Sequence, residues 1–283
     1  MKIFSKSKVK EKGLTWIILA IISKISFGKI NLRIENLINN YRGKISKKIA
    51  KKYNYTVQNG IFKGLKIQEK QWWGIGDVAI KCLGYYEIEV QDVIERVQRE
   101  NNLNTFIDIG GADGYFALGL IKNKIFEQSF IFEISSLGRK SIKNGSRLNQ
   151  VEDRISIYGE ATQYNLTQIL NEKNIELKNT LLLCDIEGEE YNLINQDLLN
   201  FLRDSYIIIE LHFFNNDLLS KKNKFLELLA SYHSLNIFNS LNRVINISSE
   251  FYLMDENERA LLLSEGRSHI GEWVLLSPKK TQS

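Results

Sequence analysis

A glycine-rich turn near the middle of the chain offers the first candidate for binding chemistry. A short apolar run, typical of a strand buried on both faces, leads into residues 108–115, which turn on glycines and enter a helical segment. A dinucleotide fingerprint requires G-x-G-x-x-G, but counting from Gly110 puts Ala112 and Tyr115 where the later glycines belong. The preceding acid, Asp108, repels a pyrophosphate and suits a cationic group. The turn therefore favours S-adenosylmethionine, which carries an ammonium and a sulfonium but no phosphate.

Carboxylates and a histidine stand at the ends of two further apolar runs. Asp185 lies near the end of Leu181–Ile186, and Glu210 and His212 close Tyr206–Leu211 two residues apart, hence on one face. We expect the three side chains to open onto one edge of a parallel sheet. Asp185 or His212 could remove a hydroxyl proton; alternatively, Asp185, Glu210 and His212 could hold a divalent ion that acidifies the hydroxyl. Both mechanisms stay open, and direct base catalysis is ranked slightly first.

Another acidic residue lies at the end of the second predicted strand, where proteins with a doubly wound sheet bind the ribose of a nucleotide. Glu133 ends the second predicted strand, 25 residues after Asp108. An acid at that place in a doubly wound sheet accepts hydrogen bonds from two ribose hydroxyls. Glu133 is therefore predicted to bind the nucleoside part of the cofactor.

The glycine turn resembles motif I of class I S-adenosylmethionine-dependent methyltransferases. Asp108, Gly110 and Gly114 match its pattern D-x-G-x-x-x-G. One departure is Ala112, at a position that is often glycine, although alanine is small enough to leave the loop intact.

A narrower resemblance, to the FkbM-type methyltransferases, rests on three segments that occur in order. Residues 181–190 are similar to the D-x-E-G-x-E segment, residues 206–212 to the I-E-L-H segment, and residues 84–87 to an upstream G-x-Y-E element. The resemblance covers roughly residues 55–278.

The resemblance implies a cofactor, a set of contacts and a substrate class. The cofactor is S-adenosyl-L-methionine, and the acceptor is a hydroxyl of a sugar, glycan precursor or related metabolite. The pairs Trp72–Trp73 and Tyr85–Tyr86 could face a sugar ring, although such pairs are more often core. The residues predicted to contact the cofactor are Asp108, Gly110, Gly111, Ala112, Gly114, Tyr115, Glu133, Glu160, Ala161 and Glu87.

The elements needed to position these residues alternate along the chain. From residue 104 onward, apolar runs alternate with segments of helical spacing, which predicts an α/β fold with a doubly wound, mostly parallel sheet. The resemblance makes this a seven-stranded, Rossmann-like methyltransferase fold. We divide the chain into a basic helical N-terminal extension (1–52), a hairpin and helix (53–100), and the S-adenosylmethionine-binding domain (101–283).

Two local elements are predicted around these domains. Residues 55–67 read as two short strands around glycine turns. The stretch Glu190 to Leu202 reads as one helix.

Composition excludes several classes of protein. The 283 residues are 43% hydrophobic and 25% charged, which is typical of a globular chain. The two cysteines, Cys82 and Cys184, lie in apolar runs, so no disulfide framework or CxxC metal site is expected. Three histidines are too few for a His-rich zinc cluster.

The first 52 residues are strongly basic. They hold 14 Lys or Arg against Glu11 and Glu35, a balance of +12 that leaves −7 for the other 231 residues. The apolar run 13–22 falls short of the roughly 20 residues that span a bilayer, and no signal-peptide cleavage site follows it. Residues 1–28 could form a helix at a membrane surface or dock on protein, so a homo-oligomer stays open. We expect a cytoplasmic enzyme, peripheral at the inner membrane face.

Two other functions are weighed against the methyltransferase. A nucleic-acid methyltransferase or binder would use the basic arm, but the body is net negative and lacks a base-flipping signature. A catalytically silent scaffold that keeps the fold only to bind partners would not need the cofactor motif. The intact Asp108, Gly110, Gly114 and Glu133 therefore argue against a scaffold. Nucleic acid is therefore not the expected partner.

Overall fold

The computed structural model describes residues 37–212, 216–242, 249–267 and 269–279. The segment 1–28, predicted to contact a membrane surface or protein, lies outside the described residues. In the part of the chain that the structure describes, no helix combines the length and the apolarity needed to cross a bilayer.

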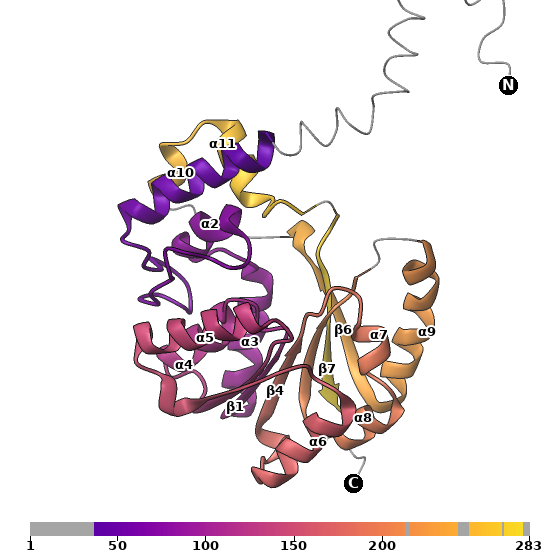
Figure 1. Ribbon diagram of the computed structural model, residues 1–283. Coiled ribbons are helices and arrows are strands. Elements are labelled where there is room, and N and C mark those ends of the chain that lie inside the picture. The colour runs from indigo at the N-terminus through magenta and orange to yellow at the C-terminus, as the bar shows by residue number, and fades with distance from the viewer. Residues whose placement is uncertain (1–36, 213–215, 243–248, 268, 280–283) are drawn as a thin grey trace, which may run out of the picture.

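A seven-stranded sheet forms the centre of the molecule (Figure 1). Its order is β3-β2-β1-β4-β5-β7-β6, with β1 to β5 parallel and β7 antiparallel to both β5 and β6. The predicted doubly wound, mostly parallel sheet is confirmed. The strands are β1 (Thr105–Ile109), β2 (Gln128–Phe132), β3 (Ile155–Tyr158), β4 (Thr180–Cys184), β5 (Tyr206–Glu210), β6 (His233–Asn239) and β7 (Glu272–Pro278).

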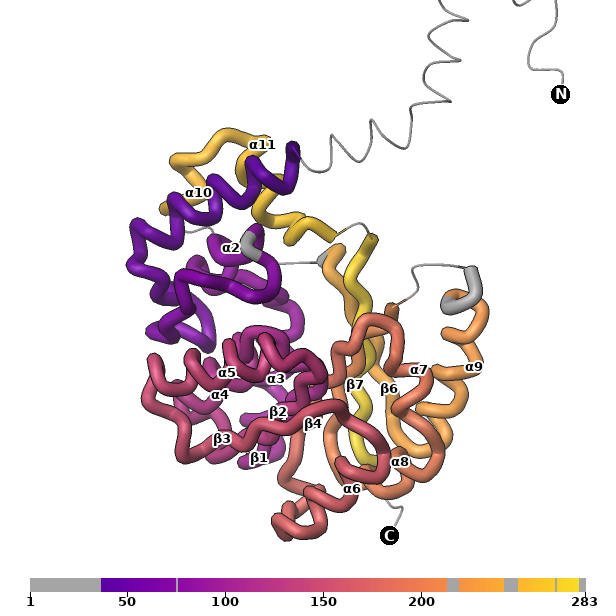
Figure 2. The backbone as a smooth tube through the Cα atoms, in the orientation of Figure 1, coloured from indigo at the N-terminus to yellow at the C-terminus, as the bar shows by residue number. Residues whose placement is uncertain are grey.

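Helices cover both faces of the sheet (Figure 2). Side chains of α3, α4 and α5 share one core cluster with the strands, and side chains of α6, α7, α8 and α9 share the other. The helices are α2 (Val78–Leu83), α3 (Ile88–Asn101), α4 (Tyr115–Lys122), α5 (Ser136–Asn149), α6 (Gln163–Glu172), α7 (Glu190–Leu193), α8 (Gln196–Phe201), α9 (Asn216–Tyr232), α10 (Ser249–Tyr252) and α11 (Glu256–Leu263).

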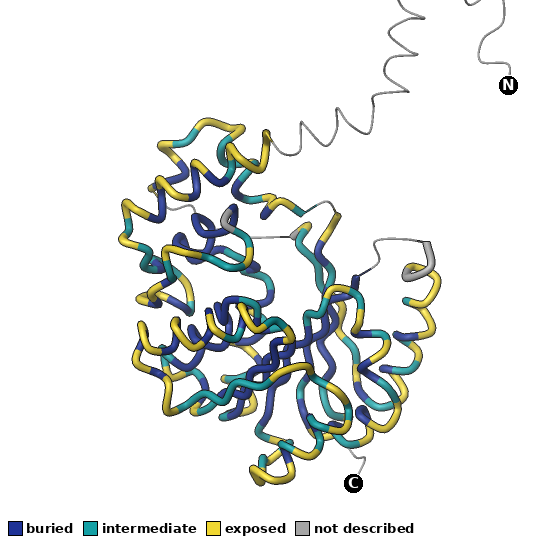
Figure 3. The backbone as a smooth tube through the Cα atoms, viewed as in Figure 1, coloured by how far each residue is buried: buried dark blue, intermediate teal, exposed yellow. Residues whose placement is uncertain are grey.

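Successive side chains of the central strands point to opposite faces of the sheet and so pack into two different core clusters. In β4, Leu181 and Leu183 belong to the cluster with α3 to α5, whereas Leu182 and Cys184 belong to the cluster with α6 to α9. Every residue of β1 and β4 is buried, as Figure 3 shows for the centre of the sheet. These strands lack a polar face because both faces are covered.

Strand register brings the predicted site residues to one edge. Ile109 is paired with Phe132 on β2 and with Cys184 on β4, and Cys184 is paired with Ile209 on β5. The next residue of each chain segment is Gly110, Glu133, Asp185 or Glu210. Four candidates from four strands therefore lie at the same level of the sheet.

A third, smaller core lies beside α2, α10 and α11. A helix over residues 37–52, indigo in Figure 1, packs Ile45 and Ile49 against it. The helix falls within the predicted basic extension. Its apolar face is buried against Phe251 and Leu262 from near the other end of the chain, so residues far apart in sequence form this cluster together.

The two strands predicted over 55–67 are reduced to one antiparallel bridge, Thr56 to Lys66. The amides of Val57, Ile67 and Gly64 donate across it to the carbonyls of Leu65, Tyr55 and Val57. Gly60 and Gly64 both have left-handed φ values, +73° and +86°, which curl the intervening chain into turns. Phe62 in this loop is fully buried among the aromatic side chains of α4, which fixes the loop on that helix.

The predicted helix Glu190 to Leu202 is also wrong, because it is two helices. At Ile194 the backbone turns extended, with ψ of 90°, and the side chain of Asn195 caps the N-terminus of α8 by accepting from the amide of Leu198. Helix α6 was not predicted, although Thr162 and Asn165 form a capping box before its buried Leu166 and Leu170.

Candidate active site

A cavity of about 720 Å³ opens at the carboxyl edge of β1, β2 and β4. Of the predicted cofactor residues, Gly110, Ala112, Glu133, Glu160 and Ala161 line it. Of the predicted catalytic residues, Asp185 lines it. The remaining lining residues are Trp72, Trp73, Ile109, Phe132, Ile134, Thr162, Gln163, Ile186, Glu187, Glu189, Asn192, Leu193 and Asn195.

The glycine turn lies close against the neighbouring strand end. Gly110 has φ +93°, and a Cβ there would overlap the backbone carbonyl oxygen of Asp185. The amides of Gly110 and Gly111 both donate to the carbonyl of Phe132, at 2.9 and 3.1 Å. Only glycine fits at Gly110, because the conformation and the contact each exclude a side chain.

Glu133 holds this turn through its carboxylate. One oxygen accepts from the amide of Ala112 at 2.8 Å, and the other accepts from the amide of Ser135 at 2.7 Å. The side chain is buried yet reaches the cavity wall. Each carboxylate oxygen has a second lone pair, so Glu133 retains acceptor capacity for the predicted ribose hydroxyls.

Four other predicted cofactor residues of the motif I region lie behind this wall. Asp108 is buried beneath the turn, and burial raises its pKa to about 7. Gly111 and Gly114 shape the turn. Tyr115 points into the core, where its ring packs edge-on to Phe62 with centroids 4.9 Å apart. These residues support the loop, and none of them lines the cavity.

Asp113 is a positioning residue that the sequence argument missed. Its buried carboxylate accepts from the amides of Trp72 and Trp73 at 3.2 and 2.9 Å, and from the hydroxyl of Ser141 at 2.7 Å. The glycine turn is thereby tied to the tryptophan pair, which lines the cavity. The signal was a second acid inside a glycine-rich turn.

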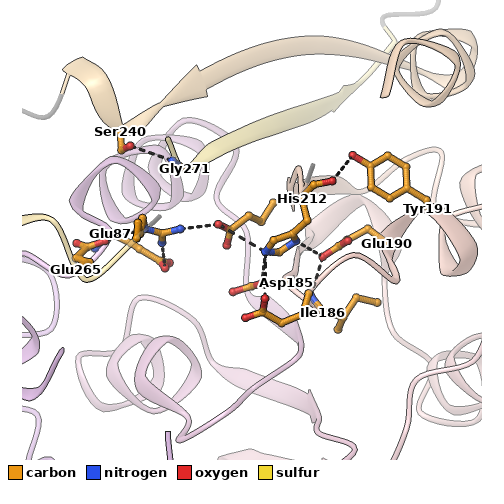
Figure 4. Close-up of polar contacts among 12 residues, drawn as sticks. Glu87, Asp185, Ile186, Glu190, Tyr191, His212, Ser240, Glu265 and Gly271 are labelled. Atoms are coloured by element: carbon orange, nitrogen blue, oxygen red, sulfur yellow. Dashed lines mark hydrogen bonds and ion pairs between the residues drawn. The ribbon is translucent and has the colours of Figure 1, made fainter. Parts of the chain in front are cut away.

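His212 stands beside the cavity in a ring of carboxylates (Figure 4). Its Nδ1 lies 2.8 Å from Glu190 Oε1, which also accepts from the amide of Ile186. Its Nε2 lies 3.7 Å from both Asp185 Oδ1 and Glu187 Oε2. Asp185 and Glu187 line the cavity, whereas His212 lies behind them. Glu190 completes the D-x-E-G-x-E pattern but was not among the predicted site residues.

Glu210 and Glu87 are held by an arginine. Arg267 Nη1 lies 2.7 Å from Glu210 Oε1, its Nη2 pairs with Glu87, and its Nε lies 3.1 Å from Glu265 Oε2. The amide of Glu87 donates to Glu265 at 2.9 Å. Arg267 therefore joins the N-terminus of α3, the end of β5 and the segment before β7, and Glu87 lies in this cluster rather than on the cavity wall.

The crowded negative charge sets the protonation of the site. Burial, followed by repulsion from Glu210 and Glu87, raises the pKa of Asp185 well above its usual range. Burial raises the pKa of Glu87 to about 8, against the opposing effect of Arg267. Burial alone would lower the pKa of His212, but the hydrogen bond and charge of Glu190, together with the charges of Glu210 and Glu187, outweigh it, so the pKa is raised.

Two overlapping sets of side chains within the described ranges are close enough to hold one ion. The first is Asp185, Glu190 and His212, and the second is Glu87, Asp185 and Glu210. The predicted set of Asp185, Glu210 and His212 is divided between them. Arg267 already occupies Glu210, which favours the first set as a metal centre.

Comparisons with known proteins identify no family. No sequence model of a known protein family matches this chain, and no curated protein matches it. Solved structures do resemble its fold at low identity.

Three such structures are methyltransferases by description. An O-methyltransferase from Bacillus cereus in complex with SAH has 13% identity and a TM-score of 0.45, covering 66% of this chain and 79% of its own. An O-methyltransferase from Streptomyces achromogenes in complex with SAM has 9% identity and a TM-score of 0.44, with coverages of 66% and 78%. A precorrin-6y C5,15-methyltransferase from Geobacter metallireducens has 12% identity and a TM-score of 0.43, with coverages of 68% and 88%. Similarity at this level does not decide activity, which we argue from the geometry.

Proposed function

We propose that this chain is an S-adenosylmethionine-dependent O-methyltransferase of the FkbM type, acting on a hydroxyl of a sugar or glycan precursor. The observation that carries the proposal is the cavity wall built from three strand ends. Gly110, which has a left-handed backbone, lines that cavity together with Glu133 and Asp185, and each of the three directly follows a strand. The sugar acceptor is supported by the resemblance and by Trp72 and Trp73 at the same cavity.

Cofactor binding would use the wall formed by β1, β2 and β3. Glu133 would accept hydrogen bonds from the ribose hydroxyls, because its carboxylate is fixed by two backbone amides. Glu160 and Ala161, which follow β3 and line the cavity, would approach the adenine. No basic side chain lines the cavity among the described residues, which suits a cofactor without phosphate.

Methyl transfer from a sulfonium needs positioning and a proton acceptor. The acceptor oxygen forms a bond to the methyl carbon as the carbon–sulfur bond breaks, and the sulfur keeps that electron pair as a neutral thioether. The hydroxyl proton passes to a base. Asp185 is the proposed base because it lines the cavity. Its raised pKa makes the ionised carboxylate a stronger proton acceptor and also makes activity rise with pH as that carboxyl ionises.

His212 would act next to Asp185. Glu190 fixes one ring nitrogen, so Nε2 is directed toward Asp185 and Glu187. A neutral His212 could accept the proton from Asp185 after small movement across the 3.7 Å gap, which returns Asp185 to its basic form. Glu210 contributes negative charge that favours protonated His212.

A divalent ion is the alternative way to acidify the acceptor hydroxyl. Buried oxygens of Asp185 (Oδ1) and Glu190 (Oε2) have no hydrogen-bond partner among the described residues, so they fit a cation held with His212. Such an ion would act as a Lewis acid. Activity that disappears with a chelator and returns with added Mg²⁺ or Mn²⁺ would favour this alternative over direct base catalysis.

Methyl transfer can be tested with methyl-labelled S-adenosylmethionine and a panel of sugars and nucleotide sugars. We expect label in a sugar product, and a loss of about a hundredfold or more in Asp185→Asn with cofactor affinity kept. Glu176→Gln, at the opposite edge of the sheet, is the control. Cofactor binding without label in any sugar would contradict the acceptor class, and absent cofactor binding would contradict the methyltransferase.

A further inference from the structure

The helix over residues 37–52 has two chemically different sides. Ile45, Ser46, Ile49 and Ala50 are buried, and their spacing of three and four places them on one face. This face packs on α2, α10 and α11. The remaining face of the helix is exposed at the edge of the molecule (Figure 3).

Lysines occupy that exposed face. Lys44, Lys47, Lys48 and Lys51 are all exposed and recur at the spacing of one helical side; we call these four residues the lysine face. The helix carries six Lys or Arg and no Asp or Glu. No ion pair to the lysine face occurs within the described residues, although Lys48 contributes to the lowered pKa of Glu250. Self-repulsion along this helix is therefore left largely uncompensated by the protein.

Apolar side chains continue the same face. Leu37 and Tyr41 stand seven and three residues before Lys44, hence on the same side of the helix, and are 68% and 46% exposed. Helix α10 is held beside this helix by the ion pair of Lys52 with Glu250, and Leu253, the residue directly after α10, is 77% exposed. Exposed leucines next to a row of lysines are the composition of an interfacial membrane helix.

We propose that the lysine face, with Leu37 and Leu253, docks on the surface of an anionic lipid bilayer. Lysines would contact the lipid phosphates while the leucines enter the boundary between headgroups and acyl chains. The rest of the chain, residues 53–283, has a net charge of −7, so it would be repelled and the helix would set the orientation. The inference stands on this surface alone and does not depend on the proposed function.

A nucleic acid is the competing anionic partner, and the apolar residues separate the two. Phosphate backbones attract lysines, but they give no reason to expose Leu37 and Leu253. An anionic bilayer binds lysines through its phosphates and buries leucines among its acyl chains. The combination of the two on this surface therefore favours a lipid bilayer over a nucleic acid as the partner.

The test uses the full chain in sedimentation with vesicles of phosphatidylcholine alone or with 30% phosphatidylglycerol. Each lysine near an anionic surface strengthens binding about fivefold. Loss of three lysines therefore weakens binding about a hundredfold, and the triple variant Lys44→Glu, Lys47→Glu, Lys51→Glu, which also adds three repelled carboxylates, should lose at least that much affinity for the anionic vesicles. Leu37→Ser with Leu253→Ser should weaken vesicle binding while leaving any RNA binding unchanged. Thermal melts check that each variant is folded.

The matched control applies the same charge change at the opposite edge of the sheet, at Lys124, Lys173 and Lys178, all exposed. We expect this control to keep its vesicle affinity within about threefold, since these lysines lie far from the docking face. Three results would overturn the proposal. They are that the full chain does not bind anionic vesicles, that the triple variant binds them as tightly as the unchanged protein, or that the full chain binds RNA but not vesicles.

Discussion

Glu190 controls the proton affinity of His212. Its carboxylate lies 2.8 Å from Nδ1 and provides the leading upward effects on the pKa of the imidazole. If His212 must be neutral to receive a proton, activity rises with pH through a pKa above the ordinary value near 6.5.

Replacing this carboxylate gives the first prediction. In Glu190→Gln the pKa of His212 falls, so the acidic limb of the kcat profile moves to lower pH. The plateau should drop about tenfold, because a buried hydrogen bond to a charged group contributes about 1.5–3 kcal/mol. A pH–rate profile from pH 5 to 9 measures both effects. Glu176→Gln should keep the original profile; an unmoved limb in Glu190→Gln would remove His212 from the proton path.

Ala112 adopts a conformation that favours glycine. Its φ is +45°, which costs a residue with a side chain about 1–2 kcal/mol, whereas glycine adds about 0.5–1 kcal/mol of unfolded-state entropy. Ala112→Gly should therefore raise the free energy of unfolding, by up to about 1 kcal/mol in urea denaturation. The same change in helix α4, Ala117→Gly, should lower it by about 1 kcal/mol. A clear loss of stability at Ala112 would contradict the left-handed turn.

At the scale of elements, the strands and their ends were predictable because their signals are local. Thr105–Ile109 and Leu181–Ile186 are short, mostly apolar runs without alternation, each with an aspartate near its end, and this pattern is typical of a strand buried on both faces. Parallel pairing then aligns the residues after each run. Gly110, Glu133 and Asp185 could thus be assigned to one edge before the register was known.

The elements that were missed depend on contacts between distant segments. Residues 55–67 alternate like strands, yet Phe62 is buried against Tyr115 and Phe116 of α4, and no local pattern shows this. Glu190 and Asp113 act through hydrogen bonds to His212 and to the amides of Trp72 and Trp73. Their partners lie 22 to 41 residues away, so the motifs that contain these acids do not show which groups the acids contact.

Asp113 gives a prediction at the element scale. Asp113→Ala removes the acceptor for the amides of Trp72 and Trp73, which frees the 72–73 segment from the glycine turn. The KM of the acceptor should rise about tenfold or more, since each lost buried bond costs about 1–3 kcal/mol, while cofactor affinity changes less. Steady-state kinetics and acrylamide quenching of tryptophan report the two effects. Asp197→Ala, on the exposed side of α8, is the control, and an unchanged KM would contradict the tether.

At the scale of the whole molecule, Arg267 fastens the segment before β7 to the sheet. It neutralises part of the charge of Glu87, Glu210 and Glu265. The pKa of Glu87 is raised to about 8 in the folded chain. Its contribution to stability is therefore fully present below the unfolded pKa near 4.3 and is lost as pH rises through about 8.

Removing the arginine should steepen this dependence. Arg267→Met leaves buried carboxylates without a cation, so the free energy of unfolding should fall by about 3 kcal/mol near neutral pH. The loss should be smaller at pH 5, where the raised pKa values keep more of these groups neutral. Urea denaturation at pH 5, 7 and 8.5 measures it, with Arg99→Met on the exposed face of α3 as control. A loss independent of pH would mean that Arg267 stabilises by packing alone.

Calorimetric titration of the full chain with S-adenosylmethionine tests the central claim most directly. We predict one site with micromolar affinity, abolished by Ala161→Trp, which fills the cavity, and kept by Ala260→Trp on the exposed face of α11. The folded state of both variants is checked by their thermal melts. No binding heat in the unchanged protein, or equal binding in Ala161→Trp, would contradict the assignment of this cavity to the cofactor.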